Sequence, residues 1–151
     1  MEATFRPAAD RDVDTILGFM RLLYAQDGLA FDEPAARAAL AGIVRDRSLG
    51  LVWMIDEGPE AIGYMVLTLG YSLMYRGRDA FVDELFVRAD RRRRGIGRKA
   101  MAIMEQACRD LEVRALHLEV ERANAAAQAL YRKFGFVDHD QYLMTRHLEK
   151  P

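Results

Sequence analysis

The sequence predicts a mixed α/β fold in a single domain, with the element order β-α-α-β-β-β-α-β-α-β. Three observations lead to this prediction. The chain has 151 residues, which fits one domain that is large enough to bury a core. Short strand-like runs are interleaved with longer segments whose apolar residues recur at helical spacing. No internal repeat or low-complexity segment interrupts this pattern, so we expect one mixed sheet layered with helices.

The N-terminal third of the chain predicts one strand followed by two helices. Thr4–Arg6 is a short strand candidate. From Asp10 onwards, apolar residues recur with the spacing of an amphipathic helix: Val13, Ile16, Leu17, Met20, Leu23 and Tyr24. Gly28 is a stop signal for this helix. We expect Asp32 to cap a second helix that runs to about Arg47.

The middle third predicts a hairpin and then a central strand. Leu49–Ile55 and Ala61–Tyr71 are strand candidates joined by the turn signal Asp56–Glu60, so the pair is expected to be antiparallel. Ser72–Asp79 is expected to be a loop. Phe81–Val87 is expected to be the central strand.

The C-terminal third predicts helix, strand, helix and strand. A helical apolar stripe is formed by Ile96, Ala100, Ile103, Met104, Ala107 and Leu111. Apolar and polar residues alternate over Leu116–Val120, which predicts a half-buried strand. A further helix is expected from Asn124 to about Phe134, ended by Gly135, and a last strand over Gln141–Leu148.

Composition restricts the class of protein. Apolar residues make up 51% and charged residues 30% of the chain, an ordinary balance for a globular protein. The single cysteine, Cys108, excludes an internal disulfide and fits a reducing compartment. No run approaches the ~18 apolar residues of a membrane span, and the charged N-terminal residues do not resemble a signal peptide. We therefore expect a cytoplasmic protein with no membrane partner.

Positive charge is concentrated in the turn that follows the central strand. Seven Lys and Arg residues and one acid lie between Arg88 and Lys99, although the formal charge of the whole chain is only -1. A glycine pair then leads into a helix, and a helix N-terminus presents free N–H groups and a partial positive charge. The near-neutral chain argues against nucleic-acid binding. We expect this turn to hold the phosphates of a discrete ligand.

Two phosphate-binding motifs can be compared with this turn. Gly95-x-Gly97-x-x-Ala100 fits the dinucleotide fingerprint, with Glu119 as the downstream acid. Four arginines precede the first glycine, however, and too little chain follows for a doubly wound half-domain. A P-loop is excluded because no Gly-Lys-Ser/Thr follows the glycines.

A second motif lies downstream at Asn124-x-x-Ala127-x-x-Leu130-Tyr131-x-x-x-Gly135-Phe136. Alone it could be an ordinary capped helix. Together with Arg92-x-x-Gly95-x-Gly97, in this order and with a strand before each, it resembles the GNAT superfamily of acyl-CoA-dependent N-acetyltransferases. The resemblance covers about Leu49 to Leu148 and implies a mixed, mostly antiparallel sheet flanked by helices. Ala89 departs from the proline that many members have there.

The resemblance implies acetyl-CoA as the acyl donor, no metal, and a set of cofactor-binding residues. The amides of Leu85, Phe86 and Val87 are expected to pair with the pantetheine arm. Asn124, in the motif with Ala127, is expected to contact the CoA arm, and Tyr131 to lie near the thioester sulfur, where its hydroxyl could protonate the leaving thiolate. The pyrophosphate is expected to be held by Arg92, Arg93, Arg94, Gly95, Ile96, Gly97 and Arg98.

The base that deprotonates the amine is expected among two adjacent acids, Asp83 and Glu84. On a regular strand they point to opposite faces, so only one faces the substrate unless a bulge intervenes. The resemblance to the diamine acetyltransferase branch favours Asp83. Alternatively, one of the two neutralises Arg88 or the arginine cluster. Acids near the site, including Asp27 or Asp32, would suit a cationic acceptor.

The remaining chemistry-bearing residues receive structural interpretations. His117, Glu119 and Glu121 share one strand face, which is interpreted as solvated, with a place in the acceptor site as the open alternative. His139 and His147 show no metal-ligand spacing. Cys108 has no evident activating partner and is expected to be inert.

The sequence is therefore interpreted as a single-domain enzyme that moves an acetyl group from acetyl-CoA to a primary amine of a small molecule, polyamine-like or amino-acid-like, by direct attack. Two alternatives stay open: acetylation of proteins or peptides, and a non-catalytic sensor that binds acyl-CoA. The resemblance also implies a homodimer.

Overall fold

The computed structural model describes residues 1–149. The chain divides into two compact units, Met1–Leu118 and Glu119–Pro151, which are described separately below.

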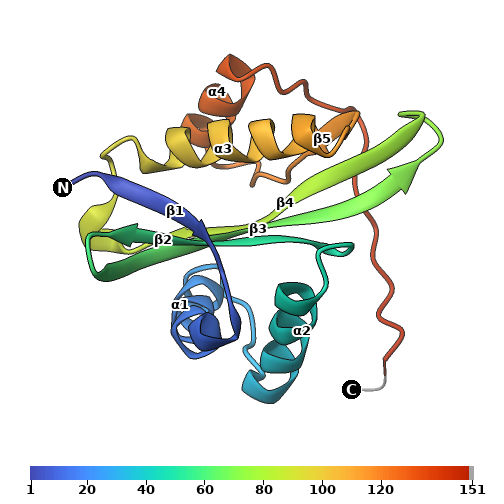
Figure 1. The fold of residues 1–151 in the computed structure, drawn as a ribbon. Coiled ribbons are helices and arrows are strands. Elements are labelled where there is room, and N and C mark those ends of the chain that lie inside the picture. Colours follow the sequence, from blue (N-terminus) through green and yellow to red (C-terminus); the bar gives the residue numbers. More distant parts are fainter. Residues whose placement is uncertain (150–151) are drawn as a thin grey trace. The chain divides into compact units, whose positions relative to one another are not determined.

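The first unit is built on one five-stranded sheet (Figure 1). Its strands lie in the order of the sequence: β1 (Ala3–Pro7), β2 (Gly50–Glu57), β3 (Glu60–Ser72), β4 (Gly77–Val87) and β5 (Ala115–His117). β1 to β4 are antiparallel, and β5 is parallel to β4. The predicted mixed, mostly antiparallel sheet flanked by helices is confirmed.

Helices cover both faces of this sheet (Figure 1). α1 (Val13–Gln26), which follows a short 3-10 turn, and α2 (Glu33–Arg45) pack on one face, and α3 (Ile96–Asp110) packs on the other. The α1 helix ends at Gln26, and the predicted stop residue Gly28 follows two positions later with a φ of 69°. Asp32 caps α2 as predicted, since its Oδ1 accepts a hydrogen bond of 3.2 Å from Ala35 N.

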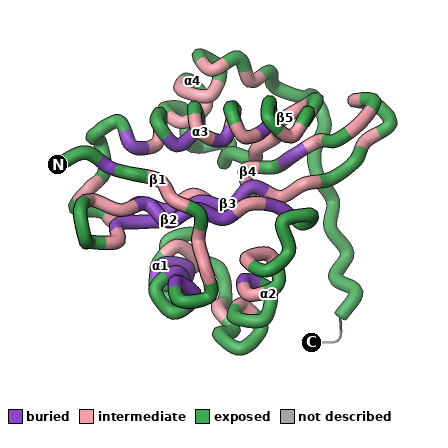
Figure 2. Tube along the Cα trace, viewed as in Figure 1, coloured by how far each residue is buried: buried purple, intermediate pink, exposed green. Residues whose placement is uncertain are grey.

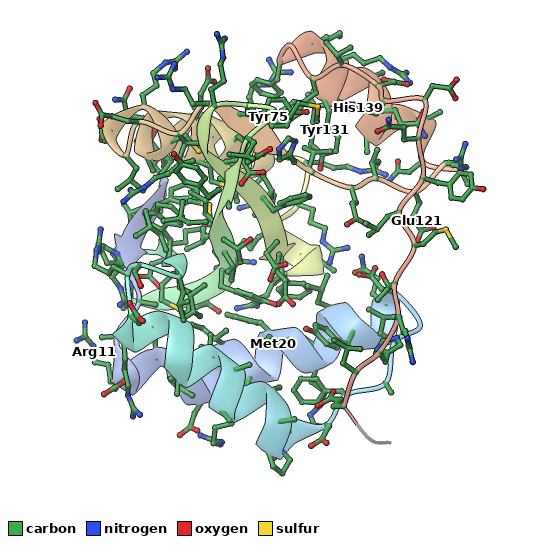
Figure 3. All side chains as sticks on the ribbon, turned by 90° about the vertical axis from the view of Figure 1, so that its right-hand side faces the viewer. Arg11, Met20, Tyr75, Glu121, Tyr131 and His139 are labelled. Atoms are coloured by element: carbon green, nitrogen blue, oxygen red, sulfur yellow. The ribbon has the colours of Figure 1, made fainter. Side chains whose placement is uncertain are left out.

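β2 and β3 are buried on both faces, so the unit has a core on each side of the sheet (Figure 2). Met54 and Tyr64 face α1 and α2, where Met20 meets them (Figure 3). Trp53 and Met65 face the stripe of α3. Burial of such side chains contributes roughly 1.5–3 kcal/mol each, which fixes the strand register.

The part of the second unit that the structure describes, residues 119–149, contains one helix, α4 (Ala125–Lys133). Asn124 caps its N-terminus, because Oδ1 accepts a 3.1 Å hydrogen bond from Ala127 N. Gly135 follows the helix with a φ of 93°, and Phe136 N then donates to Tyr131 O at 3.1 Å, as in a glycine-terminated helix.

The structure corrects three predicted boundaries. Gln141–Leu148 forms no strand, because the alternating pattern finds no ladder partner within the described residues and leaves Tyr142 and Met144 exposed. β5 ends at His117 rather than at Val120. β4 begins at Gly77, within the predicted loop, because a tight turn closed by Arg76 N donating to Leu73 O extends the hairpin.

Within the described residues, no helix is long and apolar enough to cross a membrane.

Candidate active site

A β-bulge interrupts β4 at the two acids that the sequence singled out. Opposite β3, Glu84 pairs with Val66 and Val82 pairs with Leu67, so Asp83 is the extra residue. The extra residue changes which face each side chain takes. Leu85 and Val82 both pack against the α3 side, whereas Glu84 lies on the face of α1 and α2. The expectation of strictly opposite faces therefore does not apply, and Asp83 is exposed at the bulge.

Glu84 is held by two tyrosines. The hydroxyl of Tyr24, in α1, donates to Oε2 at 2.6 Å, and the hydroxyl of Tyr64, in β3, donates to Oε1 at 2.6 Å. Tyr64 is fully buried, so these two hydrogen bonds fix the Glu84 carboxylate between α1 and the sheet. Both partners are neutral donors, and Glu84 takes part in none of the ion pairs among the described residues.

Burial and neighbouring acids make the negative charge of Glu84 costly. Burial raises the pKa of Glu84, and the charges of Asp83 and Asp27 raise it further, although the two tyrosine hydrogen bonds oppose the shift. Burial and Glu84 also raise the pKa values of Tyr24 and Tyr64, which keeps both phenols protonated as donors. The site thus concentrates acid at the C-terminal end of α1 and the bulge of β4.

The edge of β4 beyond the bulge carries free backbone donors. β5 pairs with β4 only over Asp79–Phe81, so among the described residues no strand is paired with that edge from Val82 onwards. Arg88 N donates to Ile62 O of β3 at 2.8 Å, which fixes the alternation along β4. Because successive N–H groups along an antiparallel strand point in opposite directions, those of Leu85 and Val87 point to the open edge of β4 and that of Phe86 points toward β3.

The turn between β4 and α3 has an unusual backbone. Arg93 and Gly95 both adopt positive φ values, 63° and 77°, on either side of Arg94. The first hydrogen bond of α3 runs from Lys99 N to Gly95 O at 3.1 Å. The preceding N–H groups, including those of Ile96 and Gly97, therefore have no acceptor within the helix. Such a turn at a helix N-terminus is a concave anion-binding surface.

Gly97 tests whether this turn fits the pyrophosphate of acetyl-CoA. It lies in the first turn of α3, where glycine costs about 0.5–1 kcal/mol relative to alanine. A Cβ at Gly97 would meet no other atom of the chain within 4 Å. Packing within the chain therefore gives no reason for glycine here. A ligand that approaches the backbone closely does, so the residues present fit the group.

The arginines of the turn divide into two groups. Arg88 and Arg91 are neutralised by Glu60 and Asp90, and Arg91 and Arg94 pair with Glu57. The charge of Arg88 is therefore neutralised by Glu60 and Asp90, and not by Asp83 or Glu84.

The other group, Arg92, Arg93 and Arg98, forms no ion pairs among the described residues. Arg92 Nε donates to Val87 O at 2.7 Å and its guanidinium lies 5.5 Å from the Phe86 ring, at the open edge of β4. Arg93 and Arg98 are exposed and form none of the ion pairs in the described part of the chain.

In the second unit, Tyr131 lies in α4 and its ring meets that of Phe136 edge to face, with the centroids 5.9 Å apart. Burial raises the pKa of Tyr131, so its hydroxyl is protonated at neutral pH. Asn124 uses its side-chain oxygen to cap α4.

The sequence did not predict that Tyr24 and Tyr64 donate hydrogen bonds to Glu84, and the surroundings predicted for His117 are wrong. Tyr24 was assigned to a core stripe, and nothing in the sequence connects it to Glu84, 60 residues away. Glu119 and Glu121 lie beyond the end of β5 and share no strand face with His117. The side chain of His117 is mostly covered and contacts Asp79, so the solvated interpretation of this histidine is wrong.

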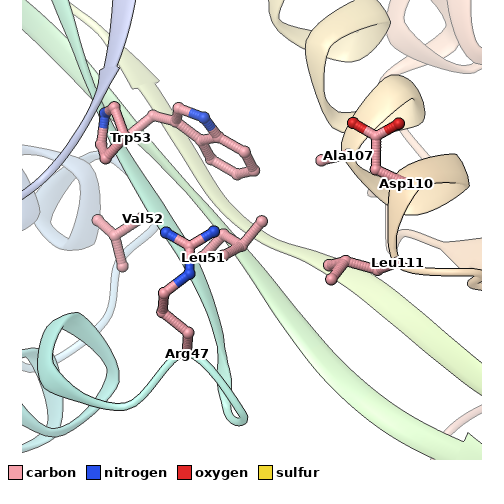
Figure 4. Close-up of a pocket in the computed structure, with 8 residues that line it drawn as sticks. Arg47, Leu51, Val52, Trp53, Ala107, Asp110 and Leu111 are labelled. Carbon is pink, nitrogen blue, oxygen red and sulfur yellow. The ribbon is translucent and has the colours of Figure 1, made fainter.

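A depression of about 210 Å³ lies between β2 and the end of α3 (Figure 4). Its lining includes Trp53, Arg47 and Asp110 but none of the residues predicted for cofactor binding or catalysis. The described residues contain no group of His, Cys, Asp and Glu that could hold a metal ion.

Comparison with known proteins decides the family. The model of the acetyltransferase (GNAT) family matches residues 16–136, which include the bulge, the glycine turn and α4. The chain belongs to the GNAT family.

Individual relatives agree with this assignment. Thialysine N-epsilon-acetyltransferase from Bos taurus is 29% identical over 82 residues, which is 54% of this chain and 48% of the relative, so the match spans about half of that protein. An integron cassette protein from the mobile metagenome of Cole Harbour Salt Marsh is 36% identical, with a TM-score of 0.85 over 97% of this chain and 91% of the other.

A predicted acetyltransferase from Clostridium acetobutylicum, solved with acetyl-CoA, has the same fold. It is 14% identical, with a TM-score of 0.81 over 96% of each chain.

Proposed function

We propose that this GNAT domain transfers an acetyl group from acetyl-CoA to the primary amine of a small cationic molecule. The observation that carries the proposal is Glu84, a half-buried carboxylate whose side-chain hydrogen bonds within the described residues come from neutral hydroxyls and which lies in the field of Asp27 and Asp83. Such a site attracts a cation. The bovine relative is named for acetylation of thialysine, a small molecule with an amine, which agrees with this class of acceptor.

Acetyl-CoA is the donor, and the chain supplies two surfaces for it. The outward N–H groups of Leu85 and Val87 bind the pantetheine amides in the manner of an added strand. The turn from Arg93 to Arg98 holds the pyrophosphate through its free N–H groups and the room above Gly97.

Glu84 takes the proton that the amine must lose. A primary ammonium has a reference pKa near ~10.4, so it arrives protonated and must release a proton to Glu84, directly or through water, before its lone pair can attack. A carboxylate with a raised pKa is a stronger base than an ordinary one. Asp83 was favoured from the sequence. The proposal gives it a different role, because it is exposed at the bulge, where its charge attracts the cation.

The transfer itself forms one bond and breaks one. The neutral amine nitrogen attacks the acetyl carbonyl carbon, and the carbon–sulfur bond then breaks, so CoA leaves as a thiolate. The nitrogen releases its second proton as the amide forms, and this proton balances the one that the thiolate takes up. Tyr131 returns a proton to the sulfur, a role that fits its motif and its protonated hydroxyl. No covalent acyl-enzyme is required.

The test is the release of free CoA thiol from acetyl-CoA across diamines, polyamines, amino acids and short peptides. The proposal predicts turnover on small cationic amines and a loss in Glu84→Gln and Tyr131→Phe. Turnover on peptides alone would replace it with protein acetylation. Tight binding of acetyl-CoA without turnover on any amine would favour a sensor, and no binding at all would overturn it.

A further inference from the structure

A second cluster of chemistry-bearing side chains lies further along β4, outside the acidic site. The ring of His117, at the end of β5, is 4.9 Å from the ring of Phe81 and 4.9 Å from that of Tyr75, measured between centroids. Its Nε2 lies 3.2 Å from Asp79 Oδ2. Strand β4, the turn before it and strand β5 therefore contribute one aromatic ring each, and the carboxylate of Asp79 contacts the ring of His117.

This aromatic cluster and Glu84 lie on the same face of the sheet. Three cross-strand pairs define that face: Val66 with Glu84, Thr68 with Phe81, and Gly70 with Asp79. Val66 belongs to the core beneath α1 and α2, and alternate residues of a strand share a face. His117 is in register with Phe81 on β5 and lies on the same side. Phe81 and Glu84 are separated by about 7–10 Å along the strand.

The cluster exposes an aromatic ring next to a shielded carboxylate. Phe81 remains 41% exposed even though His117 packs on it. The side chain of Asp79 is only 16% exposed, so its charge is directed into the cluster. Aromatic faces and a shielded carboxylate both favour an organic cation. Arg78, the neighbouring cation on β4, donates to Leu111 O toward α3 and does not neutralise this face.

We propose that Tyr75, Phe81 and His117, with Asp79 behind them, form a second acceptor subsite that holds the distal ammonium of a diamine or polyamine. This inference rests on the proposed function and extends it. The reacting amine lies at Glu84, and the other end of the acceptor lies on the exposed face of Phe81. The separation of the two sites then selects acceptors by length.

Gly70 positions the carboxylate of this subsite. A Cβ at Gly70 would approach Asp79 Oδ1 to 2.6 Å, so any side chain there displaces the carboxylate from His117. Gly70 therefore offers a way to move Asp79 without altering an aromatic ring.

The experiment compares α,ω-diamines from 1,3-diaminopropane to 1,8-diaminooctane with n-alkylamines of the same lengths, by CoA-thiol release at saturating acetyl-CoA. We expect kcat/KM for diamines to peak within the series and to exceed the matched monoamine by roughly 2- to 30-fold, the range of a cation–π contact. In Phe81→Ala and His117→Ala the peak and the diamine advantage are lost, while turnover of monoamines is retained. Gly70→Ala should reduce the advantage in part.

The control is Tyr71→Ala, which removes an exposed aromatic side chain from the opposite face of the same hairpin and should leave the length preference unchanged. Equal turnover of monoamines and diamines by the unmodified chain would overturn the subsite and leave the acetyltransferase proposal intact. A length preference that survives in Phe81→Ala would do the same. Absence of turnover on every amine, with acetyl-CoA bound, would overturn both.

Discussion

Two carboxylates in the first unit, the buried Asp12 and the half-buried Glu84, have opposite environments. Asp12 accepts two hydrogen bonds of 2.9 Å from the guanidinium of Arg6 and one of 2.8 Å from Ala9 N. Those contacts, led by Arg6, hold its pKa below the ordinary value. Glu84 is met only by the hydroxyls of Tyr24 and Tyr64, and its pKa is raised.

This difference indicates that Asp12 stabilises the fold, whereas Glu84 is suited to bind a ligand. The charge of Asp12 is compensated within the chain, where Arg6 also reaches Asp56 and ties β1 to β2. The charge of Glu84 is not compensated by any ion pair among the described residues. A cation from outside can supply what is missing, which is the condition for selective binding of an ammonium.

The largest expected effect distinguishes the two acids by activity and stability. Glu84→Gln should lower kcat by about 10²–10⁴-fold, the usual worth of a positioned base, while the protein stays folded. Asp12→Asn should retain activity but lose about 2 kcal/mol of unfolding free energy, because the half-exposed Arg6 is left without its buried partner. Acetyl-transfer kinetics and urea denaturation of both variants measure this. A severe activity loss in Asp12→Asn at a temperature where it is folded would contradict the separation.

The next effect concerns the donor side. Gly97→Ala should weaken acetyl-CoA binding by about tenfold, or ~1.4 kcal/mol, because the methyl group occupies the room for the ligand. It should also stabilise α3 by roughly 0.5–1 kcal/mol. The matched control is Gly42→Ala in α2, which also has open space and should stabilise without changing affinity. Unchanged affinity in Gly97→Ala, measured by calorimetry, would place the pyrophosphate elsewhere.

A third effect, about 1.4 kcal/mol for each pKa unit, appears in the pH dependence of stability. Glu84 has a raised pKa in the folded state, so its stabilising contribution is present at low pH and is lost as pH rises through that pKa. Asp12 has a lowered pKa, so its contribution is present above the unfolded value and is lost as pH falls through the folded one.

Urea denaturation between pH 2 and pH 8 should therefore show two opposite trends, that of Asp12 at the acid end and that of Glu84 above the ordinary glutamate pKa. With rising pH, Glu84→Gln gains stability relative to the unmodified chain and Asp12→Asn loses it. Trends of the same sign would mean that the two environments do not differ as described.

The last effect concerns Cys108, a buried ionisable group that belongs to neither site. Burial raises its pKa to about 11. At pH 8 the native thiol should therefore react roughly a hundredfold more slowly with a thiol reagent than the urea-unfolded thiol does. Equal rates would show that α3 opens readily or that burial does not govern this group.

Local sequence patterns predicted most of the fold. The stripes of α1 and α3, the Asp32 cap, the start of α4 near Asn124 and the glycine turn all depend on residues within a few positions of one another. The strand over Gln141–Leu148 was wrong because alternation describes a strand only where a partner completes the ladder.

The candidate site was only partly predictable for the same reason. Asp83 and Glu84 could be singled out, but the bulge that separates their roles depends on the register of β3. The partners of Glu84 come from residues 24 and 64, and those of His117 from residues 75, 79 and 81, so only the folded chain brings them together.

The most direct test of the account is the pH profile of kcat/KM with a diamine acceptor, measured for the unmodified chain, Glu84→Gln and Asp83→Asn. This profile reports the essential base of the free enzyme. The account predicts an acid limb with an apparent pKa above the ordinary glutamate value of about 4.3, present in Asp83→Asn and absent from the residual rate of Glu84→Gln. An acid limb that persists in Glu84→Gln, or that disappears only in Asp83→Asn, would contradict the assignment of Glu84 as the base.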